Sequence, residues 1–81
     1  MYKTINMIKD INHILIFKTN IQTECDKFRV QQFLDAIDDI QQWNIDLHDV
    51  DRVLRIVSDT LTPEQIISVI KLHGFECTEL E

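Results

Sequence analysis

Apolar and polar residues follow two different periods along this chain, and each period predicts one type of secondary structure. The first clear pattern runs from Ile14 to Phe17, where four apolar strand formers stand in a row. A strand that is apolar on both faces normally lies inside a sheet rather than at its edge. The pattern therefore predicts a central strand over residues 13–20.

The second pattern has helical spacing, with apolar residues at i, i+3, i+4 and i+7. These residues are Val30, Phe33, Leu34 and Ile37. Thr23 is the predicted N-cap of this helix, because a threonine hydroxyl can accept a hydrogen bond from a free N–H of the first turn. Asp26 adds negative charge near the helix N-terminus, where such charge is stabilising. The pair Asp38-Asp39 is expected to end the helix.

A hairpin is predicted in the middle of the chain. Apolar Trp43, Ile45 and Leu47 alternate with polar neighbours, which is typical of a strand with one buried face. Residues 49–51 then form a tight turn. The next strand is expected over residues 52–58, and the short connection makes the two strands antiparallel.

The second helix has the clearest start signal in the chain. Thr62 is the predicted N-cap, Pro63 the first helical residue, and Gln65 the partner in a capping box. The apolar face of this helix holds Ile66, Ile67, Val69 and Ile70. His73 is expected to complement the helix C-terminus, with Gly74 in a left-handed conformation just beyond it. A last strand is predicted from Phe75 to Leu80.

The element order is therefore β-α-β-β-α-β, which predicts an α+β, ferredoxin-like sandwich. In this arrangement both helices cover one face of a four-stranded antiparallel sheet. A length of 81 residues corresponds to one domain. We place this domain at residues 13–81 and treat residues 1–12 as an N-terminal lead-in segment with no assigned role.

Charge and composition exclude several classes of function. The net charge is −6, which disfavours binding to nucleic acid phosphates and to anionic membranes but could attract a basic protein partner. The sequence has no phosphate-binding glycine loop and no nucleophile–base arrangement with usable spacing, so we do not expect an enzyme. Two cysteines and no signal peptide favour a cytoplasmic protein with free thiols.

The chain resembles the heavy-metal-associated domain family, which includes small copper chaperones and domains of metal-transporting ATPases. The resemblance runs from about His13 to Leu80. It rests on four segments, which are residues 17–20, 40–47, 62–67 and 74–76. It implies the same βαββαβ fold and a metal-binding loop between the first strand and the first helix.

The metal motif of that family is missing from this loop. Members usually carry Met-x-Cys-x-x-Cys, and an alignment without gaps puts Ile21 at the methionine and Thr23 and Asp26 at the two cysteines. Cys25 lies between the aligned positions. The helix dipole would favour its thiolate, whereas the carboxylates beside it would oppose ionisation. Cys25 is thus the one metal ligand that we propose from the sequence.

The remaining candidate residues have simpler interpretations. Cys77, in the last strand, is expected to be a small core residue. Phe75 is expected to pack close to the metal loop, as the Gly-Phe corner does in the family. Asp46, His48, Asp49 and Asp51 surround the hairpin turn and could hold a divalent ion, but their spacing matches no calcium loop, so a solvated acidic turn is the preferred interpretation.

The leading hypothesis is a non-enzymatic binding or docking module with a degenerate metal loop and no cofactor. Its expected docking surface contains Thr23, Cys25, Asp26 and Phe75. One alternative is an atypical protein that binds a soft metal weakly through Cys25. A further alternative is a small regulatory ligand-binding domain of the ferredoxin-like type, although such domains favour a glycine-rich turn that is absent here. The sequence leaves the partner and the oligomeric state open.

Overall fold

The structure is a computed structural model, and it describes residues 14–80. Its elements, in chain order, are β1 (Ile14–Thr19), α2 (Glu24–Leu34), β2 (Gln42–Asp46), β3 (Val53–Val57), α3 (Pro63–Leu72) and β4 (Cys77–Glu79). This succession confirms the predicted β-α-β-β-α-β order. The predicted lead-in over residues 1–12, and His13 at the start of the first predicted strand, lie outside the described residues.

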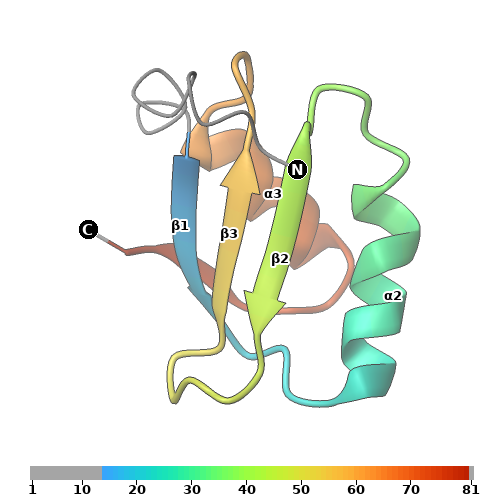
Figure 1. Cartoon of the computed structure of the whole chain (residues 1–81), viewed down its shortest axis with the longest axis vertical. Helices are drawn as coiled ribbons and strands as arrows, with labels where there is room; N and C mark the ends of the chain where they lie inside the picture. The colour runs from blue at the N-terminus through green and yellow to red at the C-terminus, as the bar shows by residue number, and fades with distance from the viewer. Residues whose placement is uncertain (1–13, 81) are drawn as a thin grey trace.

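The four strands form one antiparallel sheet in the order β2-β3-β1-β4 (Figure 1). β1 lies between β3 and β4, which confirms the central position predicted for it. The apolar side chains of the sheet are in register across its three longest strands. Leu54 of β3, for example, pairs with Phe17 of β1 and with Ile45 of β2.

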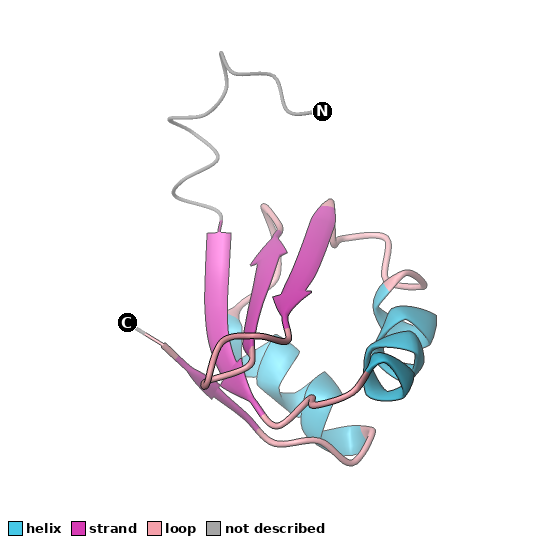
Figure 2. Ribbon diagram, turned by 60° about the horizontal axis from the view of Figure 1, so that its bottom comes forward, coloured by secondary structure: helices cyan, strands magenta, loops and turns pink. Residues whose placement is uncertain are grey.

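Both helices lie on the same side of the sheet, as predicted (Figure 2). The core between the two layers is built from residues that the sequence predicted to be buried, joined by Ile21. Its fully or almost fully buried members are Phe17, Ile21, Val30, Leu34, Ile45, Leu54, Ile56, Ile66, Ile70, Phe75 and Cys77. Among the described residues, no helix covers the other face of the sheet (Figure 2). On this face Ile16 of β1 is 36% exposed and pairs with Arg55 of β3.

The start of α3 confirms the capping box in full. Thr62 Oγ1 accepts a hydrogen bond from the Gln65 N–H at 3.2 Å, and Gln65 Oε1 accepts one from the Thr62 N–H at 2.9 Å. At the other end, Gly74 has a φ of 92°, the left-handed conformation predicted for it. His73 lies 2.9 Å from the Val69 carbonyl through Nδ1, so its ring does complement the helix C-terminus.

The first helix is shorter than predicted. α2 ends at Leu34 with Asp35 as its C-cap, and Ile37 belongs to the following turn, where its N–H donates to the Leu34 carbonyl at 3.1 Å. The last turn contains no basic residue, and Asp35 brings negative charge to the negative end of the helix dipole. Ile37 still packs against the core, which explains why it continued the helical pattern.

Several strand ends also differ from the prediction, and two strand starts have a clear local cause. Arg52 does not begin β3, because it adopts a φ of 47° in the hairpin turn and the strand starts one residue later. Phe75 precedes β4 rather than opening it. Its N–H donates to the Ile70 carbonyl at 3.2 Å, so it still belongs to the hydrogen-bonded end of α3. Strand pairing therefore begins only at Cys77.

Candidate functional site

The loop between β1 and α2 is fixed at its base by the side chain of Thr19. Its hydroxyl donates to the Arg52 carbonyl at 2.7 Å and accepts from the Ile21 N–H at 3.2 Å. Ile21 is fully buried, which anchors the loop in the core. The position aligned with the family's methionine is therefore a packing residue, and the sequence pattern had not identified it as one.

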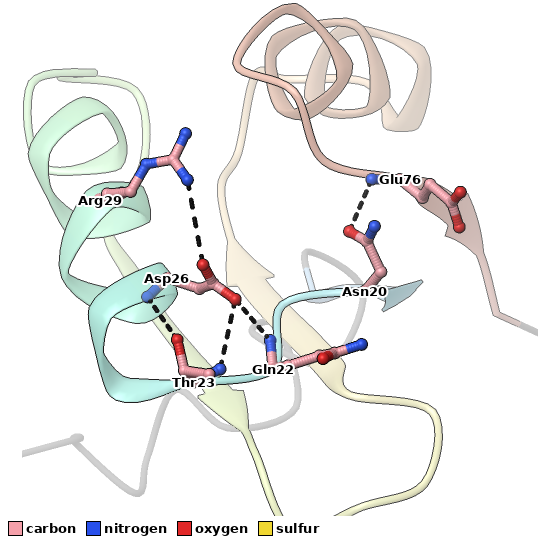
Figure 3. Close-up of polar contacts among 6 residues, drawn as sticks. All are labelled: Asn20, Gln22, Thr23, Asp26, Arg29 and Glu76. Carbon is pink, nitrogen blue, oxygen red and sulfur yellow. Dashed lines mark hydrogen bonds and ion pairs between the residues drawn. The ribbon is translucent and has the colours of Figure 1, made fainter.

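The start of α2 is a second complete capping box (Figure 3). Thr23 Oγ1 accepts from the Asp26 N–H at 3.0 Å. In return, Asp26 Oδ2 accepts from the N–H groups of Thr23 at 3.3 Å and of Gln22 at 3.1 Å. Both residues aligned with the family's cysteines are thus engaged with each other and with the backbone of the loop.

The Asp26 carboxylate is stabilised in its charged form. The bond from the Gln22 N–H lowers its pKa most, and the two bonds with Thr23 and the charge of Arg29 lower it further, so that the pKa lies below its usual value. Arg29 Nη1 is 3.9 Å from Asp26 Oδ1, one helical turn along α2. At this aligned position the loop therefore presents the charged carboxylate of Asp26, where the family has a cysteine.

Cys25 is a free and exposed thiol on the first turn of α2. It lies between Glu24 and Asp26, with neither aligned ligand position supplying a second sulfur. A thiolate suits soft metal ions, but Cu(I) sites of ordinary stability need at least two soft ligands. In the loop over residues 20–23 and the first turn of α2, Cys25 is the one thiol.

The corner before β4 lies against this loop and against α2. The Glu76 N–H donates to Asn20 Oδ1 at 2.8 Å, as Figure 3 shows, and the Arg29 guanidinium carbon lies 4.9 Å from the ring centroid of Phe75. Arg29 thus contacts both Asp26 and Phe75. Three of the residues expected on a docking surface, Thr23, Asp26 and Phe75, are joined in this way, although only 8% of Phe75 is exposed.

Cys77 is a core residue, as the sequence predicted. Its side chain is 1% exposed, and burial raises the pKa of its thiol to about 11. A thiol that remains protonated is a poor metal ligand and a poor nucleophile. Cys77 thus belongs to the core, at the position of β4 that pairs with Thr19 of β1.

The acidic hairpin turn uses its carboxylates in local hydrogen bonds. Asp46 Oδ1 accepts from the His48 N–H at 3.0 Å, and Asp49 Oδ1 accepts from the Asp51 N–H at 2.8 Å. Such bonds are typical of Asx turns. Within residues 14–80, no group of three or more His, Cys, Asp or Glu side chains is placed to hold a metal ion.

No family model and no curated protein matches this chain. A copper transporter domain shares its fold. This is the yeast domain CCC2A, whose solution structure was solved in the apo and Cu(I)-loaded states, and it superposes with a TM-score of 0.71. The match covers 84% of this chain and 94% of that domain, at 20% sequence identity. It establishes the fold, and the function must be argued from the site.

Sequence reasoning missed several residues that shape the site. Asn20, Gln22 and Arg29 had no predicted role, yet each makes one of the contacts that hold the loop. Arg29 could have been found, because it follows Asp26 at the i, i+3 spacing of helical ion pairs. Asn20 could not, because its partner Glu76 is brought to it only by the complete fold. The part of the chain that the structure describes contains no helix long and apolar enough to cross a membrane.

Proposed function

We propose that this domain is a non-enzymatic protein-docking module on the heavy-metal-associated fold and that it has lost tight Cu(I) binding. The observation that carries the proposal is the capping box of α2. Thr23 and Asp26, which align with the two family cysteines, form reciprocal hydrogen bonds with each other's backbone. These hydrogen bonds hold the loop and stabilise the first turn of α2.

The chemistry of the donor set supports this proposal. A hydroxyl is a weak ligand for Cu(I), and a carboxylate is a hard ligand where the ion is soft. Using Asp26 Oδ2 as a ligand would also compete with the two backbone N–H groups that donate to this oxygen. The residues on this loop therefore fit a structural role better than that of a Cu(I) site.

The same edge of the domain is the surface that we propose for docking. It presents the exposed thiol of Cys25, the charged pair Asp26–Arg29 and the rim of Phe75. The chain carries a net charge of −6, which favours encounters with a basic protein surface. Phe75 is almost covered, so its contribution is to hold Arg29 in place beside the loop.

The exposure of Cys25 favours a second candidate function. A surface thiol at a helix N-terminus could bind a soft metal weakly, or share the metal with a thiol of another molecule. In that case the domain would be an atypical metal-binding protein, with Cu(I) as transient cargo. The two functions differ in one measurable property, which is the affinity of the monomer for Cu(I).

The test is a competition titration of the reduced protein with Cu(I) in the presence of dithiothreitol, with bound copper measured after gel filtration. We expect the monomer to elute free of copper, because one thiolate cannot compete with a dithiol. Any residual copper should vanish in Cys25→Ser and persist in Cys77→Ala, which is the matched control at the buried thiol.

A monomer that retains one equivalent of Cu(I) against the chelator would contradict the docking proposal. If that copper required both cysteines, the site would use Cys77 as its second ligand. Copper retained only in a dimeric fraction, and lost in Cys25→Ser, would favour the second candidate function.

A further inference from the structure

An apolar groove lies at the opposite end of the sheet from the loop around Thr23. It has a volume of about 500 Å³ and runs between α3 and the connection from α2 to β2. Its apolar lining consists of Ile37, Leu61, Ile66 and Val69. In Figure 1 this end of the molecule holds the start of β1, the start of α3 and the connection that follows α2.

Glu64 lines the groove, and the chain segments that contribute to its lining are acidic. The two segments that line it, residues 35–41 and 58–69, contain no lysine or arginine. Their acidic residues are all exposed, and they are Asp35, Asp38, Asp39, Asp59 and Glu64. We call Glu64 and the exposed carboxylates of these segments the acidic rim. An apolar groove with such carboxylates nearby is complementary to a segment that combines apolar and basic side chains.

This chain contains such a segment outside the described residues. Apolar side chains occur at every third position, at Ile5, Ile8 and Ile11, and the same stretch carries Lys3 and Lys9. It holds two basic residues and only one acidic residue, Asp10. We propose that residues 3–11 bind in this groove, with the isoleucines against its apolar lining and the lysines toward its acidic rim.

The connection between the two parts is short enough for this contact. The segment joins the domain at Ile14, which pairs with Val57 at the end of β3. From Val57 the chain reaches Leu61 of the groove in four residues, held by the Ser58 hydroxyl, which accepts from the Leu61 N–H at 3.1 Å. A tether this short gives the segment a high effective concentration at the groove, so a weak contact is sufficient.

The proposal concerns the end of the domain that is remote from the capping box of α2, and it does not depend on whether the domain binds copper.

Limited trypsin digestion of the full chain tests the contact, because cleavage after Lys3 and Lys9 requires a released segment. We expect Val69→Glu, which puts a charge into the groove, to accelerate this cleavage about tenfold, in proportion to the released fraction. Leu72→Glu is the matched control on the same helix, since Leu72 is 80% exposed and does not line the groove. It should leave the rate unchanged.

A reciprocal pair of variants avoids any risk of unfolding the domain. Ile5→Asp/Ile8→Asp should accelerate cleavage and shift the methyl NMR signals of Leu61 and Val69. Thr4→Asp/Asn6→Asp changes the net charge of the segment by the same amount. It should neither accelerate cleavage nor shift these methyl signals. Equal cleavage rates in all variants, or methyl signals that do not respond to the isoleucine changes, would overturn the proposal. Protection that increases with protein concentration would also overturn it, because the occupant would then be a second copy.

Discussion

At the scale of single residues, the Asp26 carboxylate makes several of the contacts that hold the loop before α2. It accepts two backbone N–H groups of the preceding loop and lies near the Arg29 guanidinium. Each contact favours the ionised form, which is why its pKa is lowered. A group whose pKa is lower in the folded state than in the unfolded chain stabilises the fold only while it is ionised.

The pH dependence of stability should therefore report on Asp26. Its contribution is complete above the unfolded pKa, near 3.8, and is lost as the pH falls through the lower folded value. We expect Asp26→Asn to be less stable than the wild type at about pH 6, and the difference to shrink at about pH 3. Urea unfolding followed by the fluorescence of Trp43, the only tryptophan, measures both values.

Asp39→Asn is the matched control for this experiment, because it removes a carboxylate from the loop after α2 without touching a helix cap. Its difference from the wild type should stay nearly constant between the two pH values. If the difference in unfolding free energy between Asp26→Asn and the wild type were larger at the lower pH, the assigned role of the carboxylate would be contradicted.

At the scale of elements, both helices begin with a capping box, but the sequence predicted only the one at α3. The start of α3 shows Thr62 followed by proline and then Gln65, which is a familiar capping-box sequence. The start of α2 has aspartate at the third helical position, where glutamate or glutamine is usual. Asp26 was therefore predicted only as a favourable charge, although its side chain closes the same reciprocal pair of bonds.

The cap of α3 makes a quantitative prediction. Thr62→Ala should lower the free energy of unfolding by about 1 kcal/mol, because the Gln65 N–H loses its side-chain acceptor. Denaturant melts of the two proteins give the difference directly. Thr60→Ala is a suitable control, since Thr60 is exposed two residues before the cap and should change stability little. Equal midpoints for Thr62→Ala and the wild type would show that the cap does not contribute.

Element ends were harder to predict than the elements themselves. Ile37 continues the apolar spacing of α2 and packs on the core, yet it lies in a turn beyond the helix. Apolar spacing reports burial, and burial continues where the helical hydrogen bonds stop. Phe75 gives the same lesson at β4, where a buried aromatic ring precedes the strand that it was expected to open.

At the scale of the whole molecule, the fold was predictable because its signals are local and agree with each other. The apolar runs, the hairpin turn around residues 49–51 and the cap at Thr62 all support one β-α-β-β-α-β order. The site was less predictable, because it depends on contacts between distant parts of the chain. Asn20 meets Glu76, and Arg29 meets Phe75, only after both helices have packed on the sheet.

The capping box at Thr23 and Asp26 completes the first turn of α2 with the chain's own side chains, so the start of this helix needs no ligand. Replacing both residues by cysteine would exchange that state for a ligand-linked one. The apo form of Thr23→Cys/Asp26→Cys should unfold at a lower temperature than the wild type, because the cap is gone. Cu(I) should then raise its midpoint in proportion to the logarithm of the metal concentration, whereas the midpoint of the wild type should not respond.

Thr23→Ala/Asp26→Ala separates the two effects, because it loses the same hydrogen bonds and gains no thiol. It should be as unstable as the apo cysteine variant and indifferent to Cu(I). A cysteine variant that is as stable without metal as the wild type would show that the hydrogen bonds are dispensable. In the proposed docking function, the first turn of α2 is thus completed by the chain's own side chains, and copper has no part in forming the docking edge.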